Sequence, residues 1–222
     1  MEPFIAINFK TYRESLGNRG LALAKAAREV AAGTGVRIIV CPQFVDLWNV
    51  SAIGVETFAQ GASDAEPGAH TGSVSLESVK DAGCRGFLLN HAENRMPHAA
   101  IAKTVERAKR LGLESMVCAK DVAEAVELAR LNPTYVAIEP PELIGSGVSV
   151  STAKPEIVKN AVAAVAKVSK SPVVCGAGIS TAQDVAKAIE LGAAGVLLAS
   201  AYVKSENPKA LLEGFANAIA GE

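Results

Sequence analysis

The sequence predicts a single (β/α)8 barrel of the α/β class, and three observations support this prediction. Eight short apolar runs recur along the 222 residues, and a segment with helical patterning follows each of them. The runs are almost continuous in Val, Ile, Leu, Ala and Phe, which is typical of parallel strands buried on both faces. No linker rich in Pro, Gly or Ser divides the chain, so we expect one domain over residues 1–222.

Two architectures fit strands that alternate with helices: an open doubly wound sheet and a closed barrel. The count of eight favours the closed barrel, in a chain somewhat shorter than the usual size of about 250 residues. The expected strands cover, in chain order, residues 4–9, 37–41, 55–60, 86–90, 115–119, 135–139, 172–175 and 195–199.

Local signals mark the ends of several helices between these strands. A helix start is predicted where a capping residue stands three positions before an acidic residue or directly before a proline. These pairs are Asp121 with Glu124, Thr181 with Asp184, and Asn207 with Pro208. Gly112 and Gly192 predict helix ends, because glycine adopts the left-handed conformation that closes many helices.

The charge balance and the hydropathy pattern exclude two classes of partner. Lys and Arg total 22 and Asp and Glu total 23, so the net charge is −1. A nucleic-acid-binding protein usually carries an excess of basic residues, which this chain does not have. No run of apolar residues is long enough to span a membrane. The first residues lack a positively charged, apolar secretory signal, so we expect a cytoplasmic protein.

The cysteines and histidines indicate neither disulfides nor a metal site. Cys41, Cys84, Cys118 and Cys175 are far apart and form no C-x-x-C pair. The three histidines lack the spacing of zinc ligands. We therefore expect four buried free thiols and no bound metal.

In a barrel of this class, chemistry lies at the carboxyl ends of the strands. The first expected strand ends in Asn8 and Lys10, which period-two geometry places on one face. His91 follows the fourth strand and can exchange a proton near neutral pH. Glu139 ends the sixth, where desolvation makes a carboxylate a stronger base. Taken alone, Lys10 fits an ordinary solvated lysine better than a functional one, and His91 fits a hydrogen-bonded structural histidine equally well. For Glu139 the prolines and glycines of the following loop favour a function over a plain connection.

The loop after Glu139 has the composition of a lid. Its residues are Pro140, Pro141, Glu142, Leu143, Ile144, Gly145, Ser146 and Gly147. Prolines stiffen its first end and glycines leave the other end free to change its backbone angles. This combination suits a segment that moves between defined positions.

Small residues follow the seventh and eighth strands. These residues are Gly176, Ala177 and Gly178 in one loop, and Ala199 and Ser200 in the other. Backbone N–H groups of such loops can approach an anion closely, and barrels often bind phosphate there. The two loops together predict a phosphate site.

In order and spacing, these motifs resemble the triosephosphate isomerase family over the whole chain. The matching segments are Asn8-Phe9-Lys10, Gly68-Ala69-His70-Thr71-Gly72, Asn90-His91-Ala92-Glu93, and Ile138-Glu139-Pro140 with Ile144-Gly145-Ser146-Gly147. The resemblance implies a TIM barrel that forms a single catalytic domain. It also implies an aldose–ketose isomerase of glycolysis and gluconeogenesis, which interconverts dihydroxyacetone phosphate and glyceraldehyde 3-phosphate without a metal or an organic cofactor.

The resemblance also implies a role for each site residue. Glu139 removes a proton beside the carbonyl, and neutral His91 polarises that carbonyl and moves protons between the two oxygens. Lys10 and Asn8 stabilise the negative charge that develops, and Glu93 braces the site. The implied substrate and phosphate ligands are Asn8, Lys10, Gly145, Gly176, Ala177, Gly178, Ala199 and Ser200.

Several positions depart from the common family pattern. Ser73 follows Thr71-Gly72 where the family often has glutamate, and Ala92 stands where serine is common. Ala199-Ser200 replaces a pair of glycines. With the short chain, these features resemble the archaeal-type branch. That branch implies a homotetramer more readily than a homodimer, with the Thr71 loop reaching into a neighbouring subunit.

Two other functions share part of this pattern. A phosphosugar isomerase of the Amadori type would keep the phosphate site but would need different acid and base residues. A phosphometabolite-binding scaffold would keep the barrel without turnover. The combination of Asn8, Lys10, His91 and Glu139 favours triosephosphate isomerisation over both.

Overall fold

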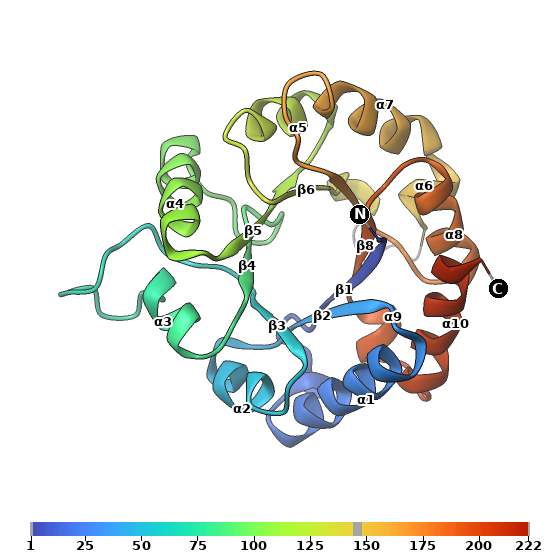
Figure 1. Cartoon of the computed structure of the whole chain (residues 1–222), viewed down its shortest axis with the longest axis horizontal. Helices are drawn as coiled ribbons and strands as arrows, with labels where there is room; N and C mark the ends of the chain where they lie inside the picture. The colour runs from blue at the N-terminus through green and yellow to red at the C-terminus, as the bar shows by residue number, and fades with distance from the viewer. Residues whose placement is uncertain (1, 144–147, 222) are drawn as a thin grey trace.

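The computed structural model describes residues 2–143 and 148–221 and is a closed barrel of parallel strands inside a ring of helices (Figure 1). The strands are β1 Phe4–Asn8, β2 Arg37–Cys41, β3 Glu56–Ala59, β4 Gly86–Leu89, β5 Glu114–Ala119, β6 Tyr135–Ile138, β7 Val173–Gly176 and β8 Gly195–Leu198. Each strand pairs with the next in the chain, and β8 pairs with β1. The predicted (β/α)8 barrel is confirmed, and the open sheet is excluded.

The helices follow the strands in the alternation that the sequence predicts. The α-helices are α1 Asn18–Thr34, α2 Leu47–Ser51, α3 Leu76–Asp81, α4 His98–Leu111, α5 Val122–Ala129, α6 Val150–Ala153, α7 Pro155–Val165, α8 Ala182–Glu190, α9 Ser200–Val203 and α10 Pro208–Ala220. Short 3-10 turns form η1 Arg13–Ser15, η2 Phe44–Asp46 and η3 Pro141–Leu143. None of the described helices is long and apolar enough to cross a membrane.

The predicted capping residues lie at the helix ends. The side chains of Asp121, Thr181 and Asn207 each accept a hydrogen bond from a backbone N–H in the first turn of the helix that follows. Thr181 and Asp184 form a complete capping box. Gly112 closes α4 with a φ of 73°, and Gly192, just beyond α8, has a φ of 91°.

Most strands end one residue before the predicted boundary, and the backbone shows why at β1 and β4. Lys10 has a φ of 46° and Asn90 a φ of 59°, both left-handed. A residue in this conformation cannot continue a parallel ladder, so β4 ends directly before Asn90 and β1 ends two residues before Lys10. Lys10, His91 and Glu139 therefore lie in the loops that leave the barrel, whereas Asn8 is the last residue of β1.

The core has an inner layer inside the barrel and an outer layer between barrel and helices. The buried side chains of the inner layer are Phe4, Ala6, Ile39, Cys41, Phe58, Leu88, Met116, Cys118, Tyr135, Ala137, Val174 and Leu197. All four cysteines are free and buried, as predicted. Burial raises the pKa of Cys84 to about 11 and that of Cys175 to about 12, so these thiols stay protonated at neutral pH.

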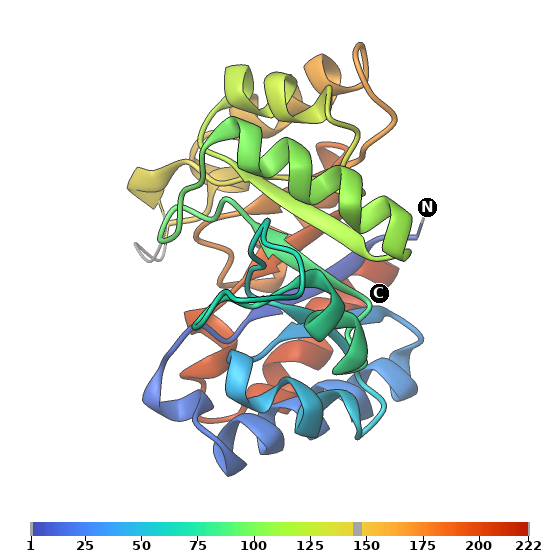
Figure 2. The ribbon, with the colours of Figure 1, turned by 90° about the vertical axis from the view of Figure 1, so that its left-hand side faces the viewer.

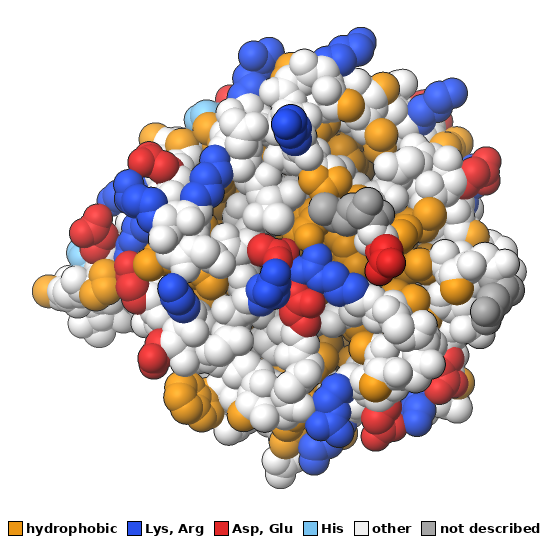
Figure 3. Space-filling view, in the orientation of Figure 1, with side chains coloured by type: hydrophobic (Ala, Val, Ile, Leu, Met, Phe, Trp, Pro, Cys, Tyr) orange, Lys and Arg blue, Asp and Glu red, His pale blue; other side chains and the backbone are white. Residues whose placement is uncertain are grey.

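A charged cluster closes the end of the barrel where the strands begin. We call this cluster the floor network, and its members are Arg37, Glu56, Arg85, Glu114 and Tyr135. Arg37 donates to Glu56 over 3.0 Å and to Glu114 over 2.8 Å. In Figure 3 acidic and basic side chains gather over the barrel axis at this end. In Figure 2 the N-terminus lies at this end, and the opposite end carries the predicted site.

A loop between β3 and α3 projects from the barrel (Figure 1). Residues 61–74 form this arm, which includes Thr71. Arg107 of α4 holds its base, because its guanidinium donates to the carbonyl oxygens of Asp64 and Ala65 and pairs with Glu77. The arm is therefore fixed at its root while its tip is exposed.

Candidate active site

A cavity of about 280 Å³ opens at the carboxyl ends of the strands. Its lining residues are Asn8, Lys10, Tyr12, His91, Glu139, Ala177, Gly178, Ile179, Ser180, Leu197, Leu198, Ala199, Ser200 and Ala201. This size is near the lower end of the range of about 300–1,000 Å³ for ligand pockets. The cavity therefore suits a small ligand, and it brings together side chains from distant parts of the sequence.

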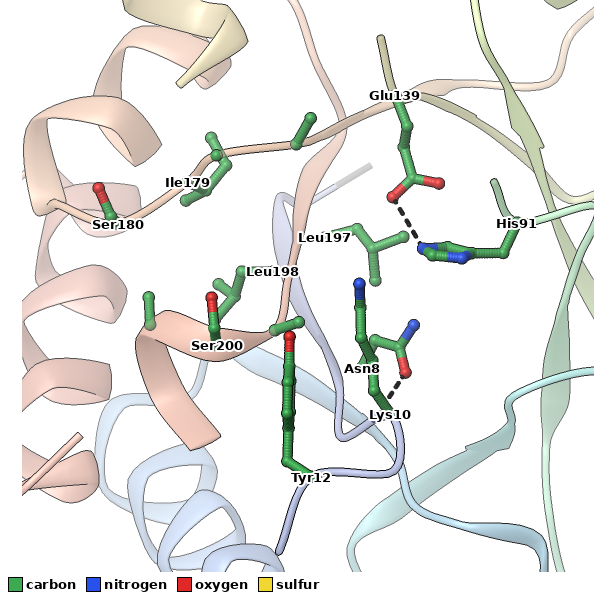
Figure 4. A pocket seen from close by; sticks show the side chains of 14 residues that line it. Asn8, Lys10, Tyr12, His91, Glu139, Ile179, Ser180, Leu197, Leu198 and Ser200 are labelled. Atoms are coloured by element: carbon green, nitrogen blue, oxygen red, sulfur yellow. Dashed lines mark hydrogen bonds and ion pairs between the residues drawn. The ribbon is translucent and has the colours of Figure 1, made fainter. Parts of the chain in front are cut away.

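The loop after β1 holds Lys10 by its backbone. The side chain of Asn8 accepts a hydrogen bond from the Lys10 N–H over 2.9 Å. Gln60 donates from Nε2 to the Lys10 carbonyl oxygen, also over 2.9 Å. Lys10 is thus fixed on both sides in its left-handed conformation, and Figure 4 shows its side chain pointing into the cavity.

Lys10 also has an ionic partner on the outer side of the cavity. Its Nζ lies 2.7 Å from Oε1 of Glu93. The Lys10 side chain is 11% exposed and that of Glu93 59% exposed, so the cation faces the cavity and the carboxylate faces solvent. This ion pair links the loop after β1 to the turn after β4.

The turn after β4 orients His91 through a set of hydrogen bonds. Asn90 donates from Nδ2 to the Cys118 carbonyl oxygen and accepts the Met96 N–H, which fixes the turn. The Glu93 N–H donates to His91 Nδ1 over 3.2 Å. Because Nδ1 accepts this bond, the neutral ring carries its proton on Nε2. That proton is the one the ring presents to the cavity.

Glu139 follows β6 and is 5% exposed. Its Oε1 lies 3.7 Å from His91 Nε2, which is longer than a hydrogen bond (Figure 4). Among the described residues, no group hydrogen-bonds to its buried Oε2. The pKa of the Cys118 thiol is raised well above its usual range, mainly by burial and secondly by the negative charge of Glu139. The thiol therefore stays neutral next to the carboxylate. The buried carboxylate therefore keeps unused acceptor capacity at the wall of the cavity.

The loop after β7 depends on glycines for two different reasons. A Cβ on Gly176 would lie 2.6 Å from Cγ of Glu139, so this glycine makes room for the carboxylate. Gly178 has a φ of 73°, and a Cβ there would collide with the carbonyl oxygen of Val148. Ala177 and Gly178 line the cavity, whereas Gly176 lies against Glu139.

The side chain of Asp184, in α8, holds the backbone of the same loop by hydrogen bonds. Its Oδ2 accepts the backbone N–H of Ser180 over 3.1 Å and that of Thr181 over 3.0 Å. Burial alone would raise the pKa of Asp184, but the hydrogen bonds outweigh it and lower the pKa. The carboxylate is therefore ionised at neutral pH and holds the loop in one conformation.

Ala199 and Ser200 follow β8 and line the cavity as predicted. In the lid, Pro140 and Pro141 lead into the turn η3, and Glu142 pairs with Lys154 over 2.7 Å. Leu143 is buried at the end of that turn. The remaining expected lid residues, Ile144, Gly145, Ser146 and Gly147, lie outside the described residues.

Sequence reasoning missed part of the cavity wall. The additional lining residues are Tyr12, Ile179, Ser180, Leu197, Leu198 and Ala201. Tyr12 could have been predicted, because an aromatic residue two positions after Lys10 lies close to the end of the first strand. Leu197 and Leu198, in contrast, have the apolar pattern of ordinary core residues. In residues 2–143 and 148–221, no group of three or more His, Cys, Asp or Glu is arranged to hold a metal ion.

Comparisons with known proteins point to one family. A sequence profile described as triosephosphate isomerase matches residues 3–217. Triosephosphate isomerase from Methanocaldococcus jannaschii is 49% identical over 205 residues, which cover 91% of this chain and 94% of that protein. The enzyme of that name from Methanothermus fervidus is 48% identical over 213 residues, which cover 95% and 96%.

A crystal structure supports the fold independently of close sequence similarity. Triosephosphate isomerase from Bartonella henselae superposes with a TM-score of 0.79 at 18% identity and covers 99% of this chain and 100% of that one. Together with the profile match and the archaeal relatives, these findings show that the chain belongs to the triosephosphate isomerase family, in its archaeal-type branch.

Proposed function

We propose that this chain interconverts dihydroxyacetone phosphate and glyceraldehyde 3-phosphate by proton transfer through an enediolate. The observation that carries the proposal is the pair formed by Glu139 and His91. A buried carboxylate oxygen without a hydrogen-bond donor lies beside an imidazole that presents its Nε2 proton to the same cavity. Proton abstraction next to a carbonyl needs both a base and an electrophile, and this pair provides them.

Glu139 acts as the base. Its carboxylate takes a proton from the carbon beside the substrate carbonyl and returns that proton to the neighbouring carbon. Oε2 is buried and accepts no hydrogen bond from a described residue, so its lone pairs are free for this transfer. Gly176 supports this role, because its missing side chain leaves the space that the carboxylate occupies.

His91 acts as the electrophile. Its Nε2–H donates to the carbonyl oxygen and then moves a proton between the two substrate oxygens. The hydrogen bond from the Glu93 N–H to Nδ1 supports a neutral ring with its proton on Nε2. In this form the ring can give its Nε2 proton to one substrate oxygen and take a proton back from the other. Lys10 and Asn8, fixed beside it, stabilise the negative charge on these oxygens.

The loops after β7 and β8 hold the phosphate through backbone N–H groups. Ala177, Gly178, Ala199 and Ser200 support this assignment, because their small side chains line the cavity. Gly145 contributes a further N–H from the lid. Closure of the lid excludes water and protects the enediolate from loss of phosphate.

A coupled assay of the purified chain, with glyceraldehyde 3-phosphate and without added metal, tests the proposal. We expect turnover in the wild type and a decrease of about 10²–10⁴-fold in Glu139→Gln, the usual contribution of a general base. Circular dichroism and melting temperature should show that the variant is folded. Near-normal turnover in Glu139→Gln contradicts the assignment of the base. Absence of turnover in the folded wild type contradicts the function.

We also propose that the chain forms a homotetramer, built from dimers in which the Thr71 arm reaches into a neighbouring subunit. Phe44, Val45 and Trp48 support this assembly, since their side chains are 43%, 84% and 62% exposed and Phe44 lies beside Gly61 at the start of the arm. Multi-angle light scattering tests it, and Val45→Asp should shift the mass toward smaller species. A monomeric wild type contradicts the proposal.

The same family membership supports a role in glycolysis and gluconeogenesis in the cytoplasm, with residues 1–222 acting as one catalytic domain. Complementation of a host that lacks its own triosephosphate isomerase tests this role. Growth on a sugar with the wild-type chain, and none with Glu139→Gln, is the expected result. Growth in neither case, with the protein expressed and active in vitro, contradicts the cellular role alone.

A further inference from the structure

The charges around the cavity do not balance the proposed substrate, and this inference rests on the function proposed above. Lys10 and Glu139 are the charged residues in the cavity lining once His91 is neutral, so their charges cancel. Glu93, which pairs with Lys10, adds a further negative charge at the rim. A phosphate monoester brings nearly two negative charges at neutral pH. The site therefore needs additional donors and positive charge near the phosphate.

Tyr12 is placed to supply a donor. It lies in the loop after β1, lines the cavity, and packs its ring against the outer core. In Figure 4 its hydroxyl is directed toward the start of α9, on the side of the cavity where Ser200 lies. Among the described residues, no group hydrogen-bonds to this hydroxyl. The mechanism proposed for Glu139 and His91 makes no use of it.

Lys204 is placed to supply the charge. Its Nζ lies 4.4 Å from the centroid of the Tyr12 ring, which is within the range of a cation–π interaction. No described carboxylate forms an ion pair with Lys204, whereas Lys187 and Lys209 both have acidic partners. The ammonium group therefore contacts the aromatic ring, and no described carboxylate is close enough to form an ion pair with it.

We propose that Tyr12 is a further phosphate-binding residue and that Lys204 positions it. The Tyr12 hydroxyl donates a hydrogen bond to a phosphate oxygen of the substrate. Lys204 holds the ring from its other face and adds positive potential at the phosphate end of the cavity. This pair acts on recognition of the phosphate group and leaves proton transfer to Glu139 and His91.

Titration with inorganic phosphate tests the proposal without relying on turnover. Tyr12→Phe keeps the ring and its contact with Lys204 but removes the hydroxyl. A hydrogen bond to a charged group contributes about 1.5–3 kcal/mol, so the Kd for phosphate should rise at least about tenfold. In the isomerase assay the KM for glyceraldehyde 3-phosphate should rise by a similar factor, with kcat changed much less.

Lys204→Met should weaken phosphate binding about threefold at low ionic strength, and the difference should disappear at high salt, as expected for a screened charge. Lys209→Met is the matched control, since it removes a lysine of α10 that pairs with Glu29, and its Kd should stay at the wild-type value. Because Lys204 is exposed, its variant tests the proposal even where Tyr12→Phe fails to fold.

Unchanged phosphate affinity in folded Tyr12→Phe overturns the proposal. So does a fall in kcat with an unchanged KM, because that result indicates a disturbed loop near Lys10. An inactive wild type that binds phosphate in a Tyr12-dependent manner would contradict the isomerase function alone. The two proposals therefore fail in different ways.

Discussion

The two ends of this barrel use charged side chains in opposite ways. At the floor network Arg37 pairs with two carboxylates and a phenol, and Arg85 pairs with Glu114. At the mouth, the opposite end of the barrel that carries the cavity, Glu139 is more deeply buried than any charged side chain of the floor network. Its Oε2 nevertheless accepts no hydrogen bond from a described residue. Polar groups that are fully paired stabilise a fold, whereas an unpaired buried group costs stability and remains available for chemistry.

Backbone conformation follows the same division. The described residues other than glycine with positive φ are Lys10, Asn90, Asn132 and Ala177. Lys10 and Ala177 line the cavity, and Asn90 directly precedes His91. Such conformations cost about 1–3 kcal/mol each and persist where surrounding contacts impose them. Strain and unpaired polar groups both concentrate at the mouth, which indicates that the floor stabilises the fold while the mouth serves the ligand.

The largest expected effect on stability comes from removing the arginine at the centre of the floor network. Arg37→Met leaves Glu56, Glu114 and the Tyr135 hydroxyl without their shared donor, and the Arg37 side chain is only 28% exposed. We expect unfolding free energy to fall by about 3 kcal/mol, as for other broken, largely buried ion pairs. Denaturant titration measures this loss, while kcat of the folded protein should stay at the wild-type value.

The Arg37 prediction tests whether the two ends are separate. A similar fall in kcat and in stability would show that the floor network also shapes the mouth. The matched control is Arg110→Met, which removes an exposed arginine that pairs with Glu106 within α4. Its effect on stability should stay within about 0.5 kcal/mol, since exposed pairs contribute little.

The next effect comes from filling the space behind the base. Gly176→Ala places a Cβ 2.6 Å from Cγ of Glu139, so the carboxylate has to shift. A misplacement of about 1 Å can lower the rate about 10²-fold, and we expect a loss of that order in kcat with a smaller change in stability. Gly214→Ala in α10 is the control, because its Cβ meets no atom within 4 Å. Full activity in Gly176→Ala would show that Glu139 tolerates displacement.

The sequence was sufficient to predict the barrel and most of the cavity because both depend on local patterns. Apolar runs and caps located the strands and helices, and the carboxyl ends of the strands had to meet at one end. Neither the pairing of Lys10 with Glu93 nor the place of Gly176 behind Glu139 was predictable from spacing. Those depend on side-chain packing between residues far apart in the chain. The contact of Tyr12 with Lys204 was unpredictable for the same reason, since Lys204 follows the eighth strand.

The smallest effect concerns the anchor of the loop after β7. Hydrogen bonds from Ser180 and Thr181 lower the pKa of Asp184 from its ordinary value of 3.8 against the opposing effect of burial. A lowered pKa in the folded state adds stability above the unfolded value and loses it as the pH falls through the folded value. Asp184→Asn should therefore be less stable than the wild type at pH 7, by about 1–2 kcal/mol for the weakened hydrogen bonds.

That difference should shrink as the pH falls from the ordinary value of 3.8 through the lowered pKa of the folded state, because the carboxylate is protonated first in the unfolded chain and then in the folded one. Urea titrations at pH 7 and at successively lower pH measure it, with Asp81→Asn on the exposed surface of α3 as the control. Phosphate affinity should decrease in parallel, since Asp184 acts on the loop that carries Gly178. A difference that stays constant with pH would mean that Asp184 supports the loop through its shape alone. The charge of Asp184 would then contribute nothing to the mouth, which would differ further from the floor network with its paired charges.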